Sequence, residues 1–187
     1  FILSLVHCLM KAGKIDLEYL SRFTNAPVLV NQDPDSPDKG LFLRDDHGAP
    51  LVINRSTGKL APFDMHGVRP DLGGSFELDG VKHITVFQLM AERYLKDEYA
   101  PEAVAERCGI PAKRIRAIAA ELARVAFEEA FELDQEWTDF RGEKHAKMVG
   151  RPVAMHSMRG VSAHANGFQT CRALHVLQII LGTVEVP

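Results

Sequence analysis

Apolar residues recur at helical spacing near both ends of the chain and in short triplets between them. The opening run Ile2–Met10 places its apolar residues on one broad helix face, and the pattern stops at Gly13. A second, short helix is predicted after Asp16, a suitable N-cap residue. Three apolar residues at helical spacing support it: Leu17, Leu20 and Phe23.

From Asn25 to about Lys82 the pattern changes to apolar triplets separated by turn-rich polar stretches. The triplets are Val28–Val30, Leu41–Leu43 and Leu51–Ile53. The pair Asp79–Gly80 lies between two strand-like runs and has the composition of a two-residue hairpin turn. This segment is therefore predicted to be rich in strands and loops. Its three histidines, His47, His66 and His83, lack ligand spacing and are expected to be solvated.

Helical spacing returns from about Thr85. A helix over Pro101–Arg107 is predicted to end at Gly109, and another is predicted from Pro111 to about Val125. The acidic, aromatic stretch Phe127–Lys147 has no sustained period. It is interpreted as an irregular connection with solvated carboxylates, in which Trp137 acts as an anchor.

The end of the chain reads as a strand over Pro152–Met155, a polar loop over Arg159–Gly167 and a helix over Phe168–Leu181. The first and last helices are then expected to flank one sheet. The fold class predicted is α/β, a Rossmann-like three-layer unit with a β-rich, loop-rich insertion. Residues 1–30 and 85–187 would form the α/β part, and residues 31–84 the insertion.

The loop Arg159–Gly167 carries the most unusual chemistry of the chain. Ligands of open α/β sheets lie beyond the carboxyl ends of the strands, beside helix N-termini. There Arg159 can donate to an anion, His164 can transfer a proton, and Asn166–Gly167 can expose backbone amides. The alternative is that Arg159 is a surface charge, His164 an ordinary loop histidine and Asn166 only the N-cap of the last helix.

Composition narrows the classes of function. The chain has 187 residues, 46% of them hydrophobic, and a formal net charge of −3, which gives no electrostatic reason to expect nucleic acid as a partner. The three cysteines, Cys8, Cys108 and Cys171, are far apart and form no CxxC pair, so a cluster or metal site within this chain is disfavoured. They are expected to be small buried apolar residues in a reducing compartment.

A rival function comes from the two helices on either side of Cys108–Pro111, which have the spacing of a helix-turn-helix. Three cations lie on the second helix: Lys113, Arg114 and Arg116. Acidic neighbours and the absence of another basic patch argue against DNA binding. A small helix-turn-helix-type binding module stays as the alternative.

Three stretches of the chain resemble molybdopterin oxidoreductases of the dimethyl sulfoxide reductase family, and their large catalytic subunit in particular. They are Ile15–Leu20 with Thr24–Pro27, Tyr99–Glu102 with Gly109–Pro111, and Pro152–Leu174. The resemblance covers nearly the whole chain and is weakest between about Asn31 and Asp71. Within the family it is greatest to the branch of sulfite dehydrogenase, of thiosulfate or polysulfide reductase and of phenylacetyl-CoA oxidoreductase, and the resemblance does not separate these members.

The resemblance implies a parent enzyme with molybdenum, or tungsten, between two pyranopterin guanine dinucleotides, and with electron transfer through iron–sulfur clusters, including a 4Fe-4S cluster. An inorganic sulfur oxyanion would be its substrate. Its expected partners are the remainder of the catalytic subunit, an electron-transfer subunit with iron–sulfur clusters, and a membrane anchor subunit. The expected location is cytoplasmic or on the cytoplasmic face of the membrane, or periplasmic after twin-arginine export.

The same resemblance assigns roles to the loop. Arg159 would orient the oxyanion, and His164 would transfer protons near it. The residues expected to contact the cofactor are Gly160, Ser162, Asn166 and Gly167. The family's metal ligand and cluster cysteines have no counterpart here, so no residue of this chain is expected to bind the metal. The chain is interpreted as a fragment of a larger multidomain subunit, inactive by itself.

Overall fold

The computed structural model describes residues 1–185, which divide into two compact units. The first unit contains residues 1–16, 93–135 and 146 onward, and the second contains residues 17–92 and 136–145. Helices and strands are both present, which confirms the α/β prediction. The functional division into residues 1–30 with 85–187 and an insertion over 31–84 stays a prediction.

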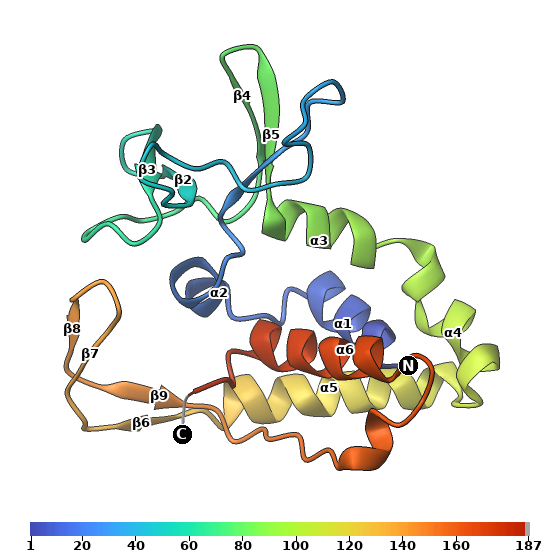
Figure 1. The fold of residues 1–187 in the computed structure, drawn as a ribbon. Helices are drawn as coiled ribbons and strands as arrows, with labels where there is room; N and C mark the ends of the chain where they lie inside the picture. The colour runs from blue at the N-terminus through green and yellow to red at the C-terminus, as the bar shows by residue number, and fades with distance from the viewer. Residues whose placement is uncertain (186–187) are drawn as a thin grey trace. The chain divides into compact units, whose positions relative to one another are not determined.

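The first unit is built around three helices: α1 (Ile2–Lys11), α5 (Ala112–Glu128) and α6 (Gly167–Leu181). The helix α1 packs against both α5 and α6, and Figure 1 shows the three helices in the same part of this unit. The apolar face predicted for the opening run is thus covered. The residues fully buried here include Val6, Leu9, Ile115, Leu177, Ile180 and Leu181.

The shorter elements of this unit are η1 (Asp97–Tyr99), α4 (Pro101–Cys108), the paired strands β6 (Phe131–Leu133) and β9 (Met148–Gly150), and η2 (Arg159–Val161). The helix α4 ends where predicted, because Gly109 adopts a left-handed backbone (φ 67°) that stops the helix.

The second unit contains α2 (Leu17–Phe23) and a three-stranded sheet ordered β1-β5-β4, from β1 (Leu29–Asn31), β4 (Ser75–Leu78) and β5 (Val81–Thr85). Its other sheets are two-stranded: β2 (Leu51–Asn54) with β3 (Lys59–Pro62), and β7 (Trp137–Thr138) with β8 (Lys144–His145). The helix α3 (Val86–Tyr94) follows β5 and continues into the first unit. A small core of Val28, Val52, Ala61 and Val68 lies beneath Phe42 and Phe63.

The hairpin between β4 and β5 turns at Asp79–Gly80, as predicted. Both residues have positive φ, 51° and 76°, the conformation that a type I′ turn requires. The triplet Leu41–Leu43, in contrast, does not form a continuous strand. It pairs with β1 through a single bridge between Val30 and Phe42 with one backbone hydrogen bond on each side, and the Leu43 carbonyl oxygen also accepts the Leu51 N–H.

The strand predicted at Pro152–Met155 is wrong, because residues 151–158 have no strand pairing. Pro152 has no N–H to offer a neighbouring strand, and the Val153 N–H is used locally, 2.7 Å from the Arg151 carbonyl oxygen. The first and last helices therefore touch each other instead of flanking a sheet. The strand pairs among residues 1–185 are all antiparallel, so the parallel pairing of a complete Rossmann-like sheet is not made within this part of the chain.

The stretch Phe127–Lys147 is also more ordered than predicted. It continues α5 to Glu128 and then forms strands β6, β7 and β8, with the β7–β8 hairpin belonging to the second unit. No helix among residues 1–185 combines the length and the apolar character that crossing a membrane requires.

Candidate functional site

The predicted site loop begins as the short helix η2 and ends at the first turn of α6. Local hydrogen bonds shape it: Ser162 Oγ donates to the Arg159 carbonyl oxygen at 3.0 Å, and the Gly167 N–H donates to the His164 carbonyl oxygen at 2.9 Å. These bonds fold the backbone back on itself between Arg159 and Gly167. The segment is therefore a defined turn although it contains no strand.

Gly167 is the one buried member of the predicted site, and it is needed there for steric reasons. A Cβ atom at this position would lie 2.1 Å from the Ser162 carbonyl oxygen. That is far inside van der Waals contact, so the two backbone segments can approach only because residue 167 is glycine. Gly160 has no such constraint, since nothing lies within 4 Å of its Cβ position.

The other predicted site residues lie exposed on this turn: Arg159, Gly160, Ser162, His164 and Asn166. The side chains of Arg159 and His164 form no hydrogen bond with any of residues 1–185 and none with each other. Asn166 occupies the N-cap position of α6, as predicted, but its side chain makes no capping bond. The structure thus presents unpaired donors on one turn, and their functional roles stay predictions.

Two large apolar side chains frame the same turn. Met158 is 70% exposed and Phe168 is 76% exposed. Exposed apolar residues beside unpaired donors are typical of a surface that contacts a ligand or another part of a protein. This feature is compatible with the predicted role of the turn.

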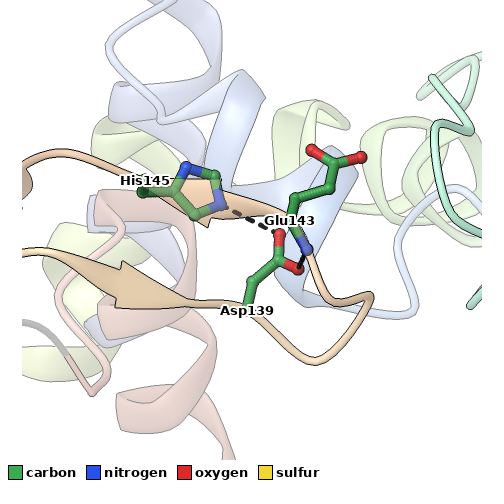
Figure 2. Close-up of side chains that lie close together, drawn as sticks. All are labelled: Asp139, Glu143 and His145. Carbon is green, nitrogen blue, oxygen red and sulfur yellow. Dashed lines mark hydrogen bonds and ion pairs between the residues drawn. The ribbon is translucent and has the colours of Figure 1, made fainter.

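A second group of polar side chains, which the sequence analysis did not single out, lies in the β7–β8 hairpin. Asp139 is buried, with its side chain 1% exposed, and Glu143 and His145 lie beside it. Figure 2 shows the Asp139 carboxylate between the His145 ring and the Glu143 backbone nitrogen. Its Oδ1 accepts the N–H groups of Arg141 and Glu143, both at 2.9 Å, so the carboxylate closes the hairpin turn.

The side chains of Asp139, Glu143 and His145 have the composition of a metal site, but the Arg22 guanidinium lies where a metal ion would be bound. Arg22 Nη2 lies 3.0 Å from Asp139 Oδ2, 2.5 Å from Glu143 Oε2 and 3.5 Å from His145 Nε2. A guanidinium nitrogen therefore occupies the point where the ligand atoms converge. The Arg22 guanidinium thus supplies one positive charge to the two carboxylates, and it ties α2 to the hairpin.

Hydrogen bonds set the charge state of this group. Burial by itself would raise the pKa of Asp139, but hydrogen bonds from His145, the backbone N–H groups and Arg22 outweigh it and lower the pKa to about 2. For Glu143, burial again opposes ionisation, and Arg69 and Arg22 lower its pKa below the ordinary value. Both carboxylates are therefore ionised at neutral pH.

Asp139 corrects the prediction that the carboxylates of this stretch are solvated. Glu128, Glu129, Glu132, Asp134 and Glu136 are exposed, as predicted, whereas Asp139 is buried. In the sequence, the aromatic residues beside Asp139 are the feature that could have indicated its burial. Trp137, predicted as an anchor, stacks on His145 with ring centroids 4.3 Å apart and lies 5.8 Å from Phe23, which confirms that role.

His83 also departs from its prediction. It is 4% exposed because its position in the middle strand β5 places it in the sheet, and its Nδ1 lies 3.1 Å from the Val81 carbonyl oxygen. His47 and His66 are exposed, as predicted. The three cysteines are partly buried and form no disulfide, and burial raises the pKa of the Cys8 thiol, as expected for an unreactive residue.

The helix pair α4 and α5 has the form of the predicted helix-turn-helix. Its second helix buries Ile115 and Ala119 and packs against α1. Arg116, one of the predicted basic residues, forms an ion pair with Glu102 at 2.5 Å. The described residues add nothing that favours nucleic acid as a ligand.

Along its whole length, the chain is similar in sequence to part of a known enzyme subunit. No family model matches the chain. The chain is 40% identical, over 197 aligned residues, to the A subunit of a sulfite dehydrogenase from Allochromatium vinosum. The match includes all of this chain and 20% of that relative, so the chain spans about a fifth of the relative's length.

Proposed function

We propose that this chain is part of the catalytic subunit of an oxidoreductase that oxidises sulfite. The observation that carries the proposal is the 40% identity to the sulfite dehydrogenase relative along the entire chain. Sulfite oxidation removes two electrons from sulfite, adds one oxygen from water and releases two protons. The enzyme must therefore bind an oxyanion, move protons and pass electrons to an acceptor.

The cofactor in this proposal is molybdenum held by two pyranopterin guanine dinucleotides, with a 4Fe-4S cluster for electron transfer. Its support is the resemblance of Pro152–Leu174 to the dimethyl sulfoxide reductase family together with the donors on the turn. Arg159, His164 and Asn166 present unpaired donors, and the first turn of α6 presents backbone N–H groups. Such donors suit the oxygen and nitrogen acceptors of a pterin dinucleotide, whose metal would perform the redox step when bound.

Residue roles follow from chemistry. The Arg159 guanidinium would hold the oxygens of sulfite, and His164 would accept a proton as water is consumed. Gly160 and Ser162 would line the approach, Asn166 would hydrogen-bond the cofactor edge, and Gly167 would allow the close backbone approach that shapes the turn. The proposed partners are the rest of the catalytic chain, an iron–sulfur electron-transfer protein and a membrane anchor. The proposed location is the cytoplasmic face of the membrane or, alternatively, the periplasm.

The experiment uses the whole protein that carries this chain, with the variants Arg159→Ala and His164→Ala. We expect sulfite-dependent reduction of an acceptor dye to fall by about 100-fold in each, the usual effect of removing one group that stabilises the transition state. Arg114→Ala, which removes an exposed arginine from α5, is the matched control and should retain full activity. Near-normal kcat/KM in both site variants would refute the roles assigned to the turn.

A further inference from the structure

A cavity of about 530 Å³ in the second unit is lined by three arginines. It lies beside α2, and its lining includes Arg22, Arg55 and Arg69 together with Glu18, which lies 3.7 Å from Arg22 Nη1. Its apolar part is formed by Leu17, Leu72 and Phe87. Cavities of this volume accommodate ligands of small-molecule size. The cavity does not include any residue of the Arg159–Gly167 turn.

Backbone pairing places two of these arginines side by side. The Arg55 N–H donates to the Arg69 carbonyl oxygen at 2.8 Å, and the Asp71 N–H donates to the Ile53 carbonyl oxygen at 2.8 Å. A bridge between Asn54 and Pro70 lies between these bonds. The two arginines therefore start from adjacent positions on paired backbone segments.

Each of the two arginines is oriented by one carboxylate and keeps further donors unused. Arg55 uses Nε toward Asp71 Oδ1 at 2.9 Å, and Arg69 uses Nη1 toward Glu143 Oε1 at 3.1 Å. Their side chains are 67% and 54% exposed. Among residues 1–185, no group accepts a hydrogen bond from the two Nη atoms of Arg55. The same holds for the Nε and Nη2 atoms of Arg69. Both guanidiniums can therefore donate to a ligand and keep their bonds to Asp71 and Glu143.

Arg22, the third arginine of the lining, has one buried donor without a partner among the described residues. Its Nη2 is occupied by Asp139 and Glu143, but its Nε is buried without a hydrogen-bond partner. Buried donors without partners are rare in folded proteins. An oxyanion in the adjacent cavity would add favourable charge beside this group.

We propose that this cavity binds a phosphate monoester whose organic part is apolar or aromatic. Asp71 and Glu143 already balance the charge of the two exposed guanidiniums, so the attraction comes from their unused donors, which match the terminal oxygens of a phosphate. The apolar side chains Leu17, Leu72 and Phe87 would contact the organic part of the ligand. A carboxylate would satisfy only one of the two forks, which favours the phosphate.

The test titrates the 187-residue chain with phenyl phosphate and with inorganic phosphate by calorimetry at low ionic strength. Phenyl phosphate should bind more tightly than inorganic phosphate because of the apolar contacts. Arg55→Ala and Arg69→Ala should each weaken phenyl phosphate binding about tenfold, the cost of a lost charge-assisted hydrogen bond. Leu17→Ala should weaken binding of phenyl phosphate and leave binding of inorganic phosphate unchanged.

Two controls separate the site from a general charge effect and from misfolding. Arg114→Ala removes the same charge from α5 in the first unit and should leave binding unchanged. Arg55→Lys keeps the charge, loses the fork and preserves the fold, and it should weaken binding almost as much as Arg55→Ala. The proposal is overturned if the unaltered chain does not bind phenyl phosphate at millimolar concentrations, or if Arg114→Ala weakens binding as much as Arg69→Ala.

Discussion

Asp139 shows how a single buried carboxylate can hold a hairpin in place. Its Oδ1 accepts two backbone N–H groups, and its Oδ2 lies 3.0 Å from both Arg22 Nη2 and His145 Nε2. Because the carboxylate is 1% exposed, removing its charge would leave Arg22 buried beside Glu143 alone. We therefore predict that this residue contributes to stability and not to metal binding.

The pKa of Asp139 predicts a pH window for this contribution. The folded-state pKa of about 2 lies below the ordinary value of 3.8, so the stabilisation is complete above about pH 4 and is lost as the pH falls toward 2. At pH 7 the free energy of unfolding of Asp139→Asn should be about 2 kcal/mol lower than that of the unaltered chain. Because the variant has no carboxylate at this position, its stability should not fall further between pH 4 and pH 2 for this reason. Urea unfolding followed by fluorescence measures both, because Trp137, the chain's single tryptophan, stacks on His145.

The control for this prediction is Asp46→Asn, which changes an exposed aspartate of the same unit. This variant should have the same stability as the unaltered chain at pH 7 and should lose stability on acidification to the same extent. Parallel pH curves for Asp139→Asn and the unaltered chain below pH 4 would show that another group carries the acid sensitivity.

At the residue scale, the sequence predicted which carboxylates are exposed better than it predicted which one is buried. The five exposed carboxylates between Glu128 and Glu136 follow from their density alone. The burial of Asp139 depends on Arg22, which lies 117 positions away in the chain, and a local pattern cannot reveal such a partner. Phe23, which packs against Trp137 beside this pair, is equally distant from the hairpin in sequence.

At the scale of elements, the entry into α6 depends on the close approach of Gly167 to the Ser162 carbonyl oxygen. Gly167→Ala should destabilise the first unit by about 2 kcal/mol or more, because a Cβ atom 2.1 Å from that oxygen forces the backbone apart. Gly160→Ala, on the same turn but in open space, should change stability by less than about 1 kcal/mol. Thermal unfolding of both variants checks this, and equal stabilities would contradict the described turn.

Helices and turns were predictable from the sequence where residues adjacent in the chain determine their ends. The helix α4 and its Gly109 terminator, and the Asp79–Gly80 hairpin, follow from residues adjacent in sequence. The strand at Pro152–Met155 failed because strand formation needs a partner, and none pairs with it among the described residues. Instead Arg151 donates to Asp16 Oδ2 and to the Ala126 carbonyl oxygen, which fixes the segment by side-chain bonds.

At the scale of the whole molecule, the chain consists of two units and spans about a fifth of the length of its relative. The helical packing of the first unit explains how the opening apolar face is covered. The family resemblance and the 40% identity to the sulfite dehydrogenase relative are the two observations that support the proposed sulfur oxyanion chemistry. The α/β class was predictable from patterning, whereas the proposed site depends on the resemblance, because an exposed arginine and histidine have no local signature of function.

The most direct test of the central claim is to purify the whole protein that carries this chain, with its partner subunits, and to measure molybdenum content together with sulfite-dependent dye reduction. We predict about one molybdenum per catalytic subunit, as one bis-dinucleotide cofactor requires, and turnover with sulfite. Protein that has received the cofactor and still does not oxidise sulfite would contradict the proposed activity, and protein without molybdenum after competent cofactor insertion would contradict the proposed class of enzyme.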